Sequence, residues 1–290
     1  MQVIAHGGAG GTPDTPGPRQ AAVEAAARAG SRESDPATAV VTAITVMEHD
    51  PQFNAGIGGV VQSDGVVRTD AGIMAEDRSI GAACGMPNVA NAIAVAEAVR
   101  TNTPHVLLAG KPAVRFARAH DINAVNRCRT TDRHQAWLET GLADASYPEE
   151  LEAVRSSFGG SGMDTVGAVA TDGDRLAAGT STAGRGLALQ GRVGDVPLVG
   201  CGFFATPIGG VSTTGAGEAI IQTMLARAAV AELEAGNHPT IAATRAIDIF
   251  EAETAERAGI IVATPDGGVG SAYNSSVMQT AVARDGEQAQ

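Results

Sequence analysis

The stretch GMDTVGAVATDGDRLAAGTSTAG, residues 162–184, decides the fold of this chain. Apolar and small residues alternate from Thr165 to Ala170 and again from Leu176 to Thr180, which is the pattern of two half-buried strands. The cluster Thr180-Ser181-Thr182 follows Thr165 about one hairpin later. The stretch therefore raises the question of why hydroxyl-bearing residues stand at both places.

The composition bounds the size of the protein and the kind of core that it forms. The chain has 290 residues, 44% of them apolar, which is enough for one large layered domain or two small ones. Its 37 glycines indicate many tight turns or close backbone approaches. Because aromatic residues make up only 3%, the core must consist mostly of alanine, valine, isoleucine and leucine.

The charge balance argues against two classes of partner. The formal net charge is -12, and Lys111 is the only lysine. Nucleic acid and anionic membrane surfaces both need clustered basic residues, so we expect neither as a partner. A lysine-poor, acidic composition fits a salt-rich cytoplasm and a GC-rich genome equally well.

The cysteines and the first residues bear on the compartment. Cys84, Cys128 and Cys201 are few and far apart, which is typical of reduced, buried thiols. The opening MQVIAHGGAG lacks the basic and apolar regions of a signal peptide, and no window is long and apolar enough to span a bilayer. We therefore expect a soluble, cytoplasmic protein.

The remaining pattern predicts an α+β fold. We expect helices at 18–31, 36–48, 88–100, 111–120, 216–235 and 240–257, with Asp35 as the N-cap of the second. We expect strands at 2–6, a hairpin and a further strand within 59–84 that turns at 63–65, a buried strand at 105–110, and two strands within 259–283. Residues 126–162 predict a partial helix followed by a flexible linker. Together these elements suit one domain over 1–290, built as a four-layer αββα sandwich.

Thr165 would be a poor nucleophile without a base. The stretch around it contains no histidine or lysine, and the six histidines do not cluster near it. The α-amino group of Thr165 itself, with a pKa of about 7.7–8, would serve, provided that the peptide bond after Asp164 is cut first. The glycine-rich linker ending at Met163-Asp164 is what a self-cleaving junction needs.

Seven motifs in order carry a resemblance to a known family. They are HGGAG at 6–10, FNAGIGGV at 53–60, DAGIM at 70–74, DTVGAVA at 164–170, TST at 180–182, GRVGDVPLVG at 191–200 and TGAGE at 214–218. The sequence resembles the plant-type L-asparaginase/isoaspartyl peptidase family of N-terminal-nucleophile hydrolases, whose relatives include glycosylasparaginases and threonine aspartases. The resemblance implies self-cleavage between Asp164 and Thr165 into segments 1–164 and 165–290, which associate as (αβ)2.

The resemblance also implies catalytic roles. Thr165 would attack a side-chain amide carbonyl, Thr182 would steady it, and Thr214 with Gly215 would stabilise the oxyanion near a helix start. Taken alone, Thr182 would be an ordinary strand threonine and Thr214 an ordinary N-cap.

The substrate implied by the resemblance carries an α-carboxylate and an α-ammonium. Arg192 would clamp the carboxylate and Asp195 would receive the ammonium, whereas taken alone these two residues would be a surface ion pair. The implied activity is hydrolysis of L-asparagine and β-aspartyl dipeptides to L-aspartate, with no cofactor for the chemistry. Glycosylasparaginase activity and a non-catalytic, unprocessed binding or assembly protein are the alternatives.

The loop MEHDPQFNAGI at 47–57 resembles a sodium-binding loop of the family that presents Asn54 toward the active site. The resemblance implies a structural Na⁺ held by the backbone carbonyls of Met47, Glu48, Asp50, Phe53, Ala55 and Ile57. The alternative is a turn that closes by its own hydrogen bonds and needs no ion.

Two residues depart from the family pattern. Asp164 stands where the asparaginase branch commonly has glycine, although related branches cut an Asp-Thr bond. Ala183 replaces the first glycine of TSTGG, and its methyl group, beside the pocket, puts the breadth of substrates in doubt.

Overall fold

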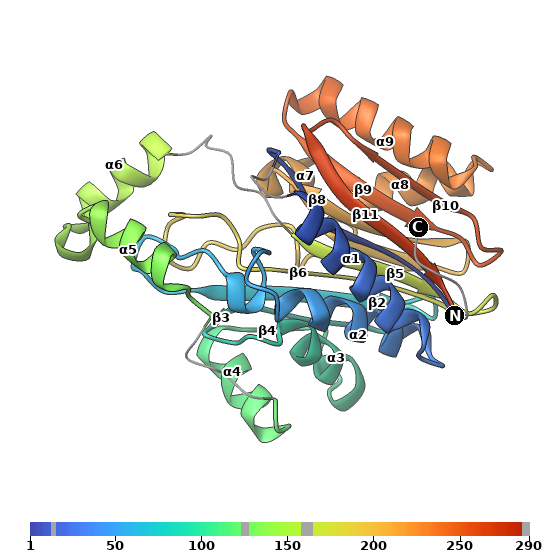
Figure 1. The fold of residues 1–290 in the computed structure, drawn as a ribbon, viewed down its shortest axis with the longest axis horizontal. Coiled ribbons are helices and arrows are strands. Elements are labelled where there is room, and N and C mark those ends of the chain that lie inside the picture. Colours follow the sequence, from blue (N-terminus) through green and yellow to red (C-terminus); the bar gives the residue numbers. More distant parts are fainter. Residues whose placement is uncertain (13–15, 123–127, 158–164, 286–290) are drawn as a thin grey trace.

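The computed structural model describes residues 1–12, 16–122, 128–157 and 165–285, which form two β-sheets and their covering helices (Figure 1). The larger sheet has seven strands in the order β11-β1-β5-β6-β2-β3-β4, and the smaller has four in the order β10-β9-β8-β7. Neighbouring strands are antiparallel except for the parallel pair β3 and β4.

The bounds of the elements are as follows. The strands of the large sheet are β1 (Gln2–Gly10), β2 (Arg68–Ala75), β3 (Ile80–Pro87), β4 (Leu107–Ala109), β5 (Val166–Thr171), β6 (Leu176–Thr182) and β11 (Val277–Arg284). The small sheet contains β7 (Phe203–Thr206), β8 (Gly209–Gly215), β9 (Ala258–Ala263) and β10 (Val269–Tyr273). The helices are α1 (Pro16–Ser31), α2 (Pro36–Glu48), α3 (Ala92–Asn102), α4 (Gly110–Ala119), α5 (Thr131–Glu139), α6 (Tyr147–Ser157), α7 (Gly217–Thr223), α8 (Leu225–Glu234) and α9 (Pro239–Thr254).

The predicted hairpin lies at the centre of the large sheet. β5 pairs with β6 in a register that sets Val166 opposite Ser181, and β6 continues to Thr182. β1 and β2 flank the hairpin, so both of its strands are hydrogen-bonded on each side. A central position explains the near-continuous apolar and small residues of this stretch, since water reaches neither face.

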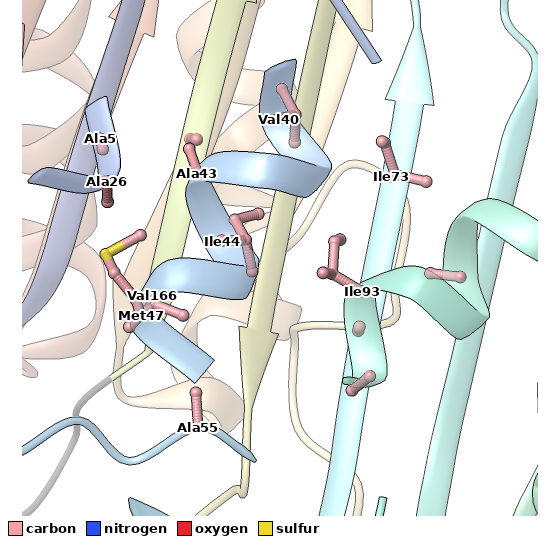
Figure 2. Close-up of a cluster of buried hydrophobic side chains, with 14 of the residues drawn as sticks. Ala5, Ala26, Val40, Ala43, Ile44, Met47, Ala55, Ile73, Ile93 and Val166 are labelled. Atoms are coloured by element: carbon pink, nitrogen blue, oxygen red, sulfur yellow. The ribbon is translucent and has the colours of Figure 1, made fainter. Parts of the chain in front are cut away.

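The apolar core consists of three clusters, each between two layers of the fold. One cluster lies between the large sheet and α1, α2 and α3, and Figure 2 shows Ile44 and Met47 of α2 over Val166 of β5. A second lies between the facing sheets and includes Leu176 and Phe203. The third lies between the small sheet and α8 and α9. The sheets approach closely because Gly72 has no side chain; a Cβ there would run into the Phe203 ring.

Several helices match their predictions. The helix predicted at 36–48 is α2, and Asp35 caps it by accepting a hydrogen bond from the Thr38 backbone at 3.0 Å. The helices predicted at 18–31, 88–100, 111–120 and 240–257 are α1, α3, α4 and α9, with ends shifted by a few residues. The partial helix within 126–162 is α5 and α6, and the predicted linker at 158–162 lies outside the described residues.

Two predictions about single elements are wrong. Residues 105–110 do not form a buried strand: β4 is a three-residue edge strand, paired only with β3, and Leu107 is 41% exposed. Residues 216–235 are not one helix, because Met224 is left-handed (φ 48°) between α7 and α8. The first N–H groups of α8 bond instead to the preceding loop, with Arg227 donating to Gly200 at 2.9 Å.

The first strand and the first hairpin also differ from the prediction. β1 continues past residue 6 to Gly10, with an irregular register between His6 and Ala9. The turn at 63–65 is present, since Gly65 donates to the Gln62 carbonyl at 2.9 Å, but residues 59–67 form no strand. The hairpin consists of β2 and β3, which turn at 76–79.

Candidate active site

Thr165 lies at the start of β5 and is 6% exposed. It lines a small cavity together with Thr182, Arg192, Asp195 and Gly215, which the sequence had suggested for one site. These five residues come from two strands of the large sheet, one strand of the small sheet and the loop between them. Asp164, the other half of the predicted cleavage site, lies outside the described residues.

Thr182 lies opposite Thr165 because of the strand register. Val166 pairs with Ser181, so the residues one step outward on the antiparallel pair are Thr165 and Thr182. Directly opposite residues have their Cβ atoms about 5 Å apart. The Thr182 hydroxyl accepts from the Gly184 backbone at 3.0 Å and donates to the Asn54 carbonyl at 3.4 Å, which fixes its orientation.

Arg192 is held by a carboxylate that sequence reasoning left without a role. Its Nε and Nη2 donate to the two carboxylate oxygens of Glu218, at 2.9 and 3.0 Å. Such a two-pronged bond fixes the plane of the guanidinium. Glu218 is the last residue of the TGAGE motif and lies in the first turn of α7. The sequence alone does not indicate that it pairs with Arg192. The remaining N–H groups of Arg192 are available to a second carboxylate.

Asp195 is a buried carboxylate with room for a cation. It is 5% exposed, and its Oδ2 has no hydrogen-bond partner within the described residues. Burial raises the pKa of Asp195 to about 6, although the positive charge of Arg192 opposes the shift. Gly217 leaves space for both charged groups: a Cβ there would come within 2.8 Å of Arg192 Nη2 and of Asp195 Oδ1. An ammonium group would supply what this carboxylate lacks.

Thr214 and Gly215 differ in how they face the cavity. Gly215 lines it, with φ 141°, whereas Thr214 is fully buried and is not among the lining residues. The Thr214 hydroxyl accepts from the Ala9 backbone at 3.3 Å. Ala216, not Thr214, is the N-cap of α7, so the N-cap interpretation of Thr214 is wrong.

Asn54 supports the site without lining it. Its Nδ2 donates to the Gly184 carbonyl at 2.6 Å, and its Oδ1 accepts from the Val60 backbone at 2.9 Å. Its own carbonyl accepts from Ala183 at 2.9 Å. Asn54 thus fixes the chain directly after Thr182. The Ala183 methyl group does not face the cavity; it is fully buried against Val61 and neighbouring apolar residues.

Two carbonyl oxygens of the predicted sodium loop lie directly against glycines. Cβ atoms on Gly56 and Gly58 would run into the carbonyl oxygens of Glu48 and Phe53, respectively. Three of the other predicted ligands also accept hydrogen bonds within the loop: the carbonyls of Met47, Asp50 and Ala55 each accept one at 3.2 Å. A carbonyl oxygen has two lone pairs, so the set fits an oxygen-coordinated cation. In the described parts of the chain, no group of three histidine, cysteine or acidic side chains is placed to hold a metal ion.

One histidine that is far from Thr165 in the sequence lies close to it in the fold. His6 is fully buried and contacts the backbone of Thr165, and its Nε2 lies 2.7 Å from the Ser212 hydroxyl. Burial lowers the pKa of His6 to about 3, against the opposing effect of the Thr165 contact, so the ring is neutral. A base this weak is a poor acceptor for the proton of the Thr165 hydroxyl.

A further acid that sequence reasoning missed is Asp70, which pairs with Thr182 across β2 and β6. It is 2% exposed, and its Oδ1 accepts from the Gly85 backbone at 2.6 Å. Burial raises the pKa of Asp70 to about 7. Its only signal in the sequence was its place at the head of DAGIM. Two facing threonines, a guanidinium and a buried carboxyl thus surround a small polar cavity in this α+β protein.

Comparison with known proteins gives one family over the whole chain. The asparaginase family model matches residues 1–290. The plant-type L-asparaginase of Pyrococcus horikoshii is 38% identical over 264 residues, covering 88% of this chain and 85% of that protein. The isoaspartyl peptidase/L-asparaginase of Danio rerio is 34% identical over 295 residues, covering 98% and 93%. This chain therefore belongs to the asparaginase family, which confirms the resemblance read from the seven motifs.

Within the described residues, no helix is both long enough and apolar enough to cross a membrane.

Proposed function

We propose that this protein is a hydrolase that cleaves the side-chain amide of L-asparagine and of β-aspartyl dipeptides and releases L-aspartate. The names of its relatives support both substrates. The observation that carries the proposal is the cavity in which Thr165 and Thr182 face Arg192 and Asp195. An aspartyl unit offers a carboxylate for the guanidinium, an ammonium for the carboxylate, and a carbonyl for the hydroxyl.

The chemistry begins with cleavage of the bond between Asp164 and Thr165, which leaves segments 1–164 and 165–290. The freed α-amino group of Thr165 takes the proton of its hydroxyl and passes it to the leaving amine. The hydroxyl oxygen attacks the amide carbon and forms an acyl-enzyme, which water then hydrolyses. Gly215 lines the cavity, and its N–H stabilises the oxyanion. The Thr214 hydroxyl is buried outside the cavity, where it accepts from the Ala9 backbone, and it would have to turn toward the cavity to assist.

The wider architecture belongs to the same proposal. The chain is one N-terminal-nucleophile domain with a four-layer αββα arrangement, supported by the three apolar clusters between its sheets and helices. A Na⁺ ion in the loop at 47–57 would hold that turn closed and keep Asn54 on Gly184. Two processed copies associate as (αβ)2, and the protein acts in the cytoplasm on a small-molecule substrate without a cofactor for the chemistry.

The test combines a denaturing gel with product release. We expect wild-type protein to give two bands that split before Thr165, and to release aspartate from L-asparagine and β-Asp-Leu. Thr165→Ala should give one full-length, inactive band. Thr171→Ala, at the far end of β5, is the matched control and should process and turn over normally. An unsplit but active wild type would show that the α-amino base is wrong.

The same assay separates the alternatives. Release of aspartate from a glycosylated asparagine, with no turnover of L-asparagine or β-Asp-Leu, would identify a glycosylasparaginase. A single band with no turnover of any substrate would identify a non-catalytic binding protein.

A further inference from the structure

A second cavity, of about 150 Å³, lies beside the candidate active site and is not explained by it. Its walls are mostly apolar and include Val60, Val61, Ala136, Trp137 and Leu187. We call it the α5 pocket, because Ala136 and Trp137 belong to that helix. The catalytic cavity, in contrast, is lined largely by charged residues, threonines and glycines. One cavity is polar and its neighbour is apolar, which suggests that they bind the polar and the apolar part of one ligand.

The two cavities share one segment of chain. Gly184 and Arg185 line the catalytic cavity, and the next two residues, Gly186 and Leu187, line the α5 pocket. Successive Cα atoms lie about 3.8 Å apart, so the two cavities meet along this segment. The loop that contains Asn54 and Val61 runs beside it: Asn54 donates to the Gly184 carbonyl at 2.6 Å, and Leu187 donates to the Val61 carbonyl at 2.9 Å.

The α5 pocket is preformed. The Trp137 indole donates to the Ser63 carbonyl at 2.9 Å, so its polar edge is satisfied, and the part of the ring that its neighbours leave uncovered lines the pocket. His134 stacks on the ring with centroids 5.9 Å apart, and Gly65 packs under it, where a Cβ would come within 2.7 Å. Trp137 also packs against the apolar cluster that contains Ala183, the residue directly after Thr182. The wall of the pocket is therefore tied to the catalytic strand.

The apolar lining of the α5 pocket indicates which part of a substrate it could bind. In a β-aspartyl dipeptide the aspartyl unit uses Arg192 and Asp195, and the leaving residue must extend beyond the Thr165 hydroxyl. We propose that the α5 pocket binds the apolar side chain of that leaving residue, so that among β-aspartyl dipeptides the protein prefers a large apolar leaving residue over glycine. Arg133 also lines the pocket, and its positive charge suits the carboxylate of a leaving amino acid. This inference rests on the proposed function, whose site it extends.

The expected effect is a substrate preference. Burying a leucine side chain favours binding by about ten- to a hundredfold, so kcat/KM for β-Asp-Leu should exceed that for β-Asp-Gly by at least tenfold. L-Asparagine, whose leaving group is ammonia, should be insensitive to changes in the pocket. The quantity to follow is the ratio of kcat/KM for β-Asp-Leu to kcat/KM for L-asparagine.

The test uses two matched charge changes on α5. Ala136→Glu places a carboxylate in the pocket, whereas Leu138→Glu, two residues on, changes an exposed side chain that does not line it. We expect Ala136→Glu to lower the selectivity ratio at least tenfold and Leu138→Glu to leave it unchanged. Equal kcat/KM for β-Asp-Leu and β-Asp-Gly in the wild type, or an equal effect of the two variants, would overturn the inference. No turnover of any of the three substrates would instead overturn the proposed function, and the inference with it.

Trp137 offers a second measurement, because it is the only tryptophan in the chain. When processed enzyme is mixed with excess β-Asp-Leu, we expect the intrinsic fluorescence to change during the first turnovers, as the leucine side chain covers the indole. L-Asparagine should leave the emission unchanged. The same response to both substrates would contradict occupancy of the pocket by the leaving residue.

Discussion

Replacing Asp195 by asparagine should stabilise the fold while abolishing the proposed activity. The carboxylate is 5% exposed, and one of its oxygens has no partner within the described residues. Burial raises the pKa of Asp195 from 3.8 to about 6, with Arg192 opposing the shift. At neutral pH the folded chain therefore holds a charge that the unfolded chain carries at lower cost in water. Asparagine keeps the shape and removes that charge.

The magnitude follows from the two pKa values. One pKa unit corresponds to about 1.4 kcal/mol, so the ionised carboxylate costs the folded state roughly 3 kcal/mol above pH 6. The sign is fixed by the direction of the shift: the folded state binds the proton more tightly, so the wild type is relatively most stable below pH 3.8 and loses stability as the pH rises to about 6. The advantage of the asparagine variant should be about 3 kcal/mol at pH 7.5 and about 1 kcal/mol at pH 4.5.

The assay is urea unfolding at these two pH values in the Thr165→Ala background, where both proteins remain single chains. Asp248→Asn, at an exposed position on α9, is the control and should change the unfolding free energy little at either pH. In the cleavable background, Asp195→Asn should lower kcat/KM for L-asparagine at least a hundredfold, because the α-ammonium loses its counter-charge. If Asp195→Asn is less stable than the parent at pH 7.5, or if its advantage does not depend on pH, the desolvation argument is wrong.

Three further changes probe the same site. Glu218→Gln should raise KM for L-asparagine about tenfold with little change in kcat, since Arg192 loses one charged acceptor; an unchanged or lower KM would mean that Glu218 competes with the substrate. Gly217→Ala should abolish activity in a folded protein, because its methyl group would crowd Arg192 and Asp195, whereas Gly11→Ala, with open space around it, should remain active. Replacing Na⁺ by choline should lower the melting temperature and the activity together, and restoring Na⁺ should restore both; a melting temperature indifferent to Na⁺ would exclude the ion.

The sequence predicted those elements in which a regular apolar spacing and a capping or turn residue pointed to the same structure. The helix at 36–48 had both a capping residue and a regular apolar spacing, and its ends were predicted to the residue. The strands from Phe203 to Thr206 and from Gly209 to Gly215 were missed, because their glycines and threonines give no clear alternation. Exposure of the edge strand β4 could not be read from its apolar sequence, since it depends on the absence of a neighbouring strand on one side.

In the candidate site, too, motifs indicated some residues, whereas the roles of others depend on tertiary packing. Motifs placed Thr165, Thr182, Arg192 and Asp195 in one site, and the structure brings them to one cavity. Glu218 was missed as the partner of Arg192 because an ion pair across 26 residues leaves no trace in local spacing. His6 and Asp70 were missed because their properties come from burial, which shifts the pKa of the histidine down and that of the aspartate up. Burial depends on the packing of both sheets and not on any one motif.

The charges of the site are arranged so that the ligand completes them. Glu218 already satisfies one edge of the Arg192 guanidinium, and the other N–H groups remain for a carboxylate. Asp195 keeps an oxygen open at a position where its own charge is costly. Under the proposed function, a zwitterionic amino acid would supply an anion to the first and a cation to the second, so its binding would offset the cost of burying the Asp195 charge. A ligand with only one of the two charges would leave the other group unsatisfied, so the proposed recognition depends on the pair of charges and not on the amide alone.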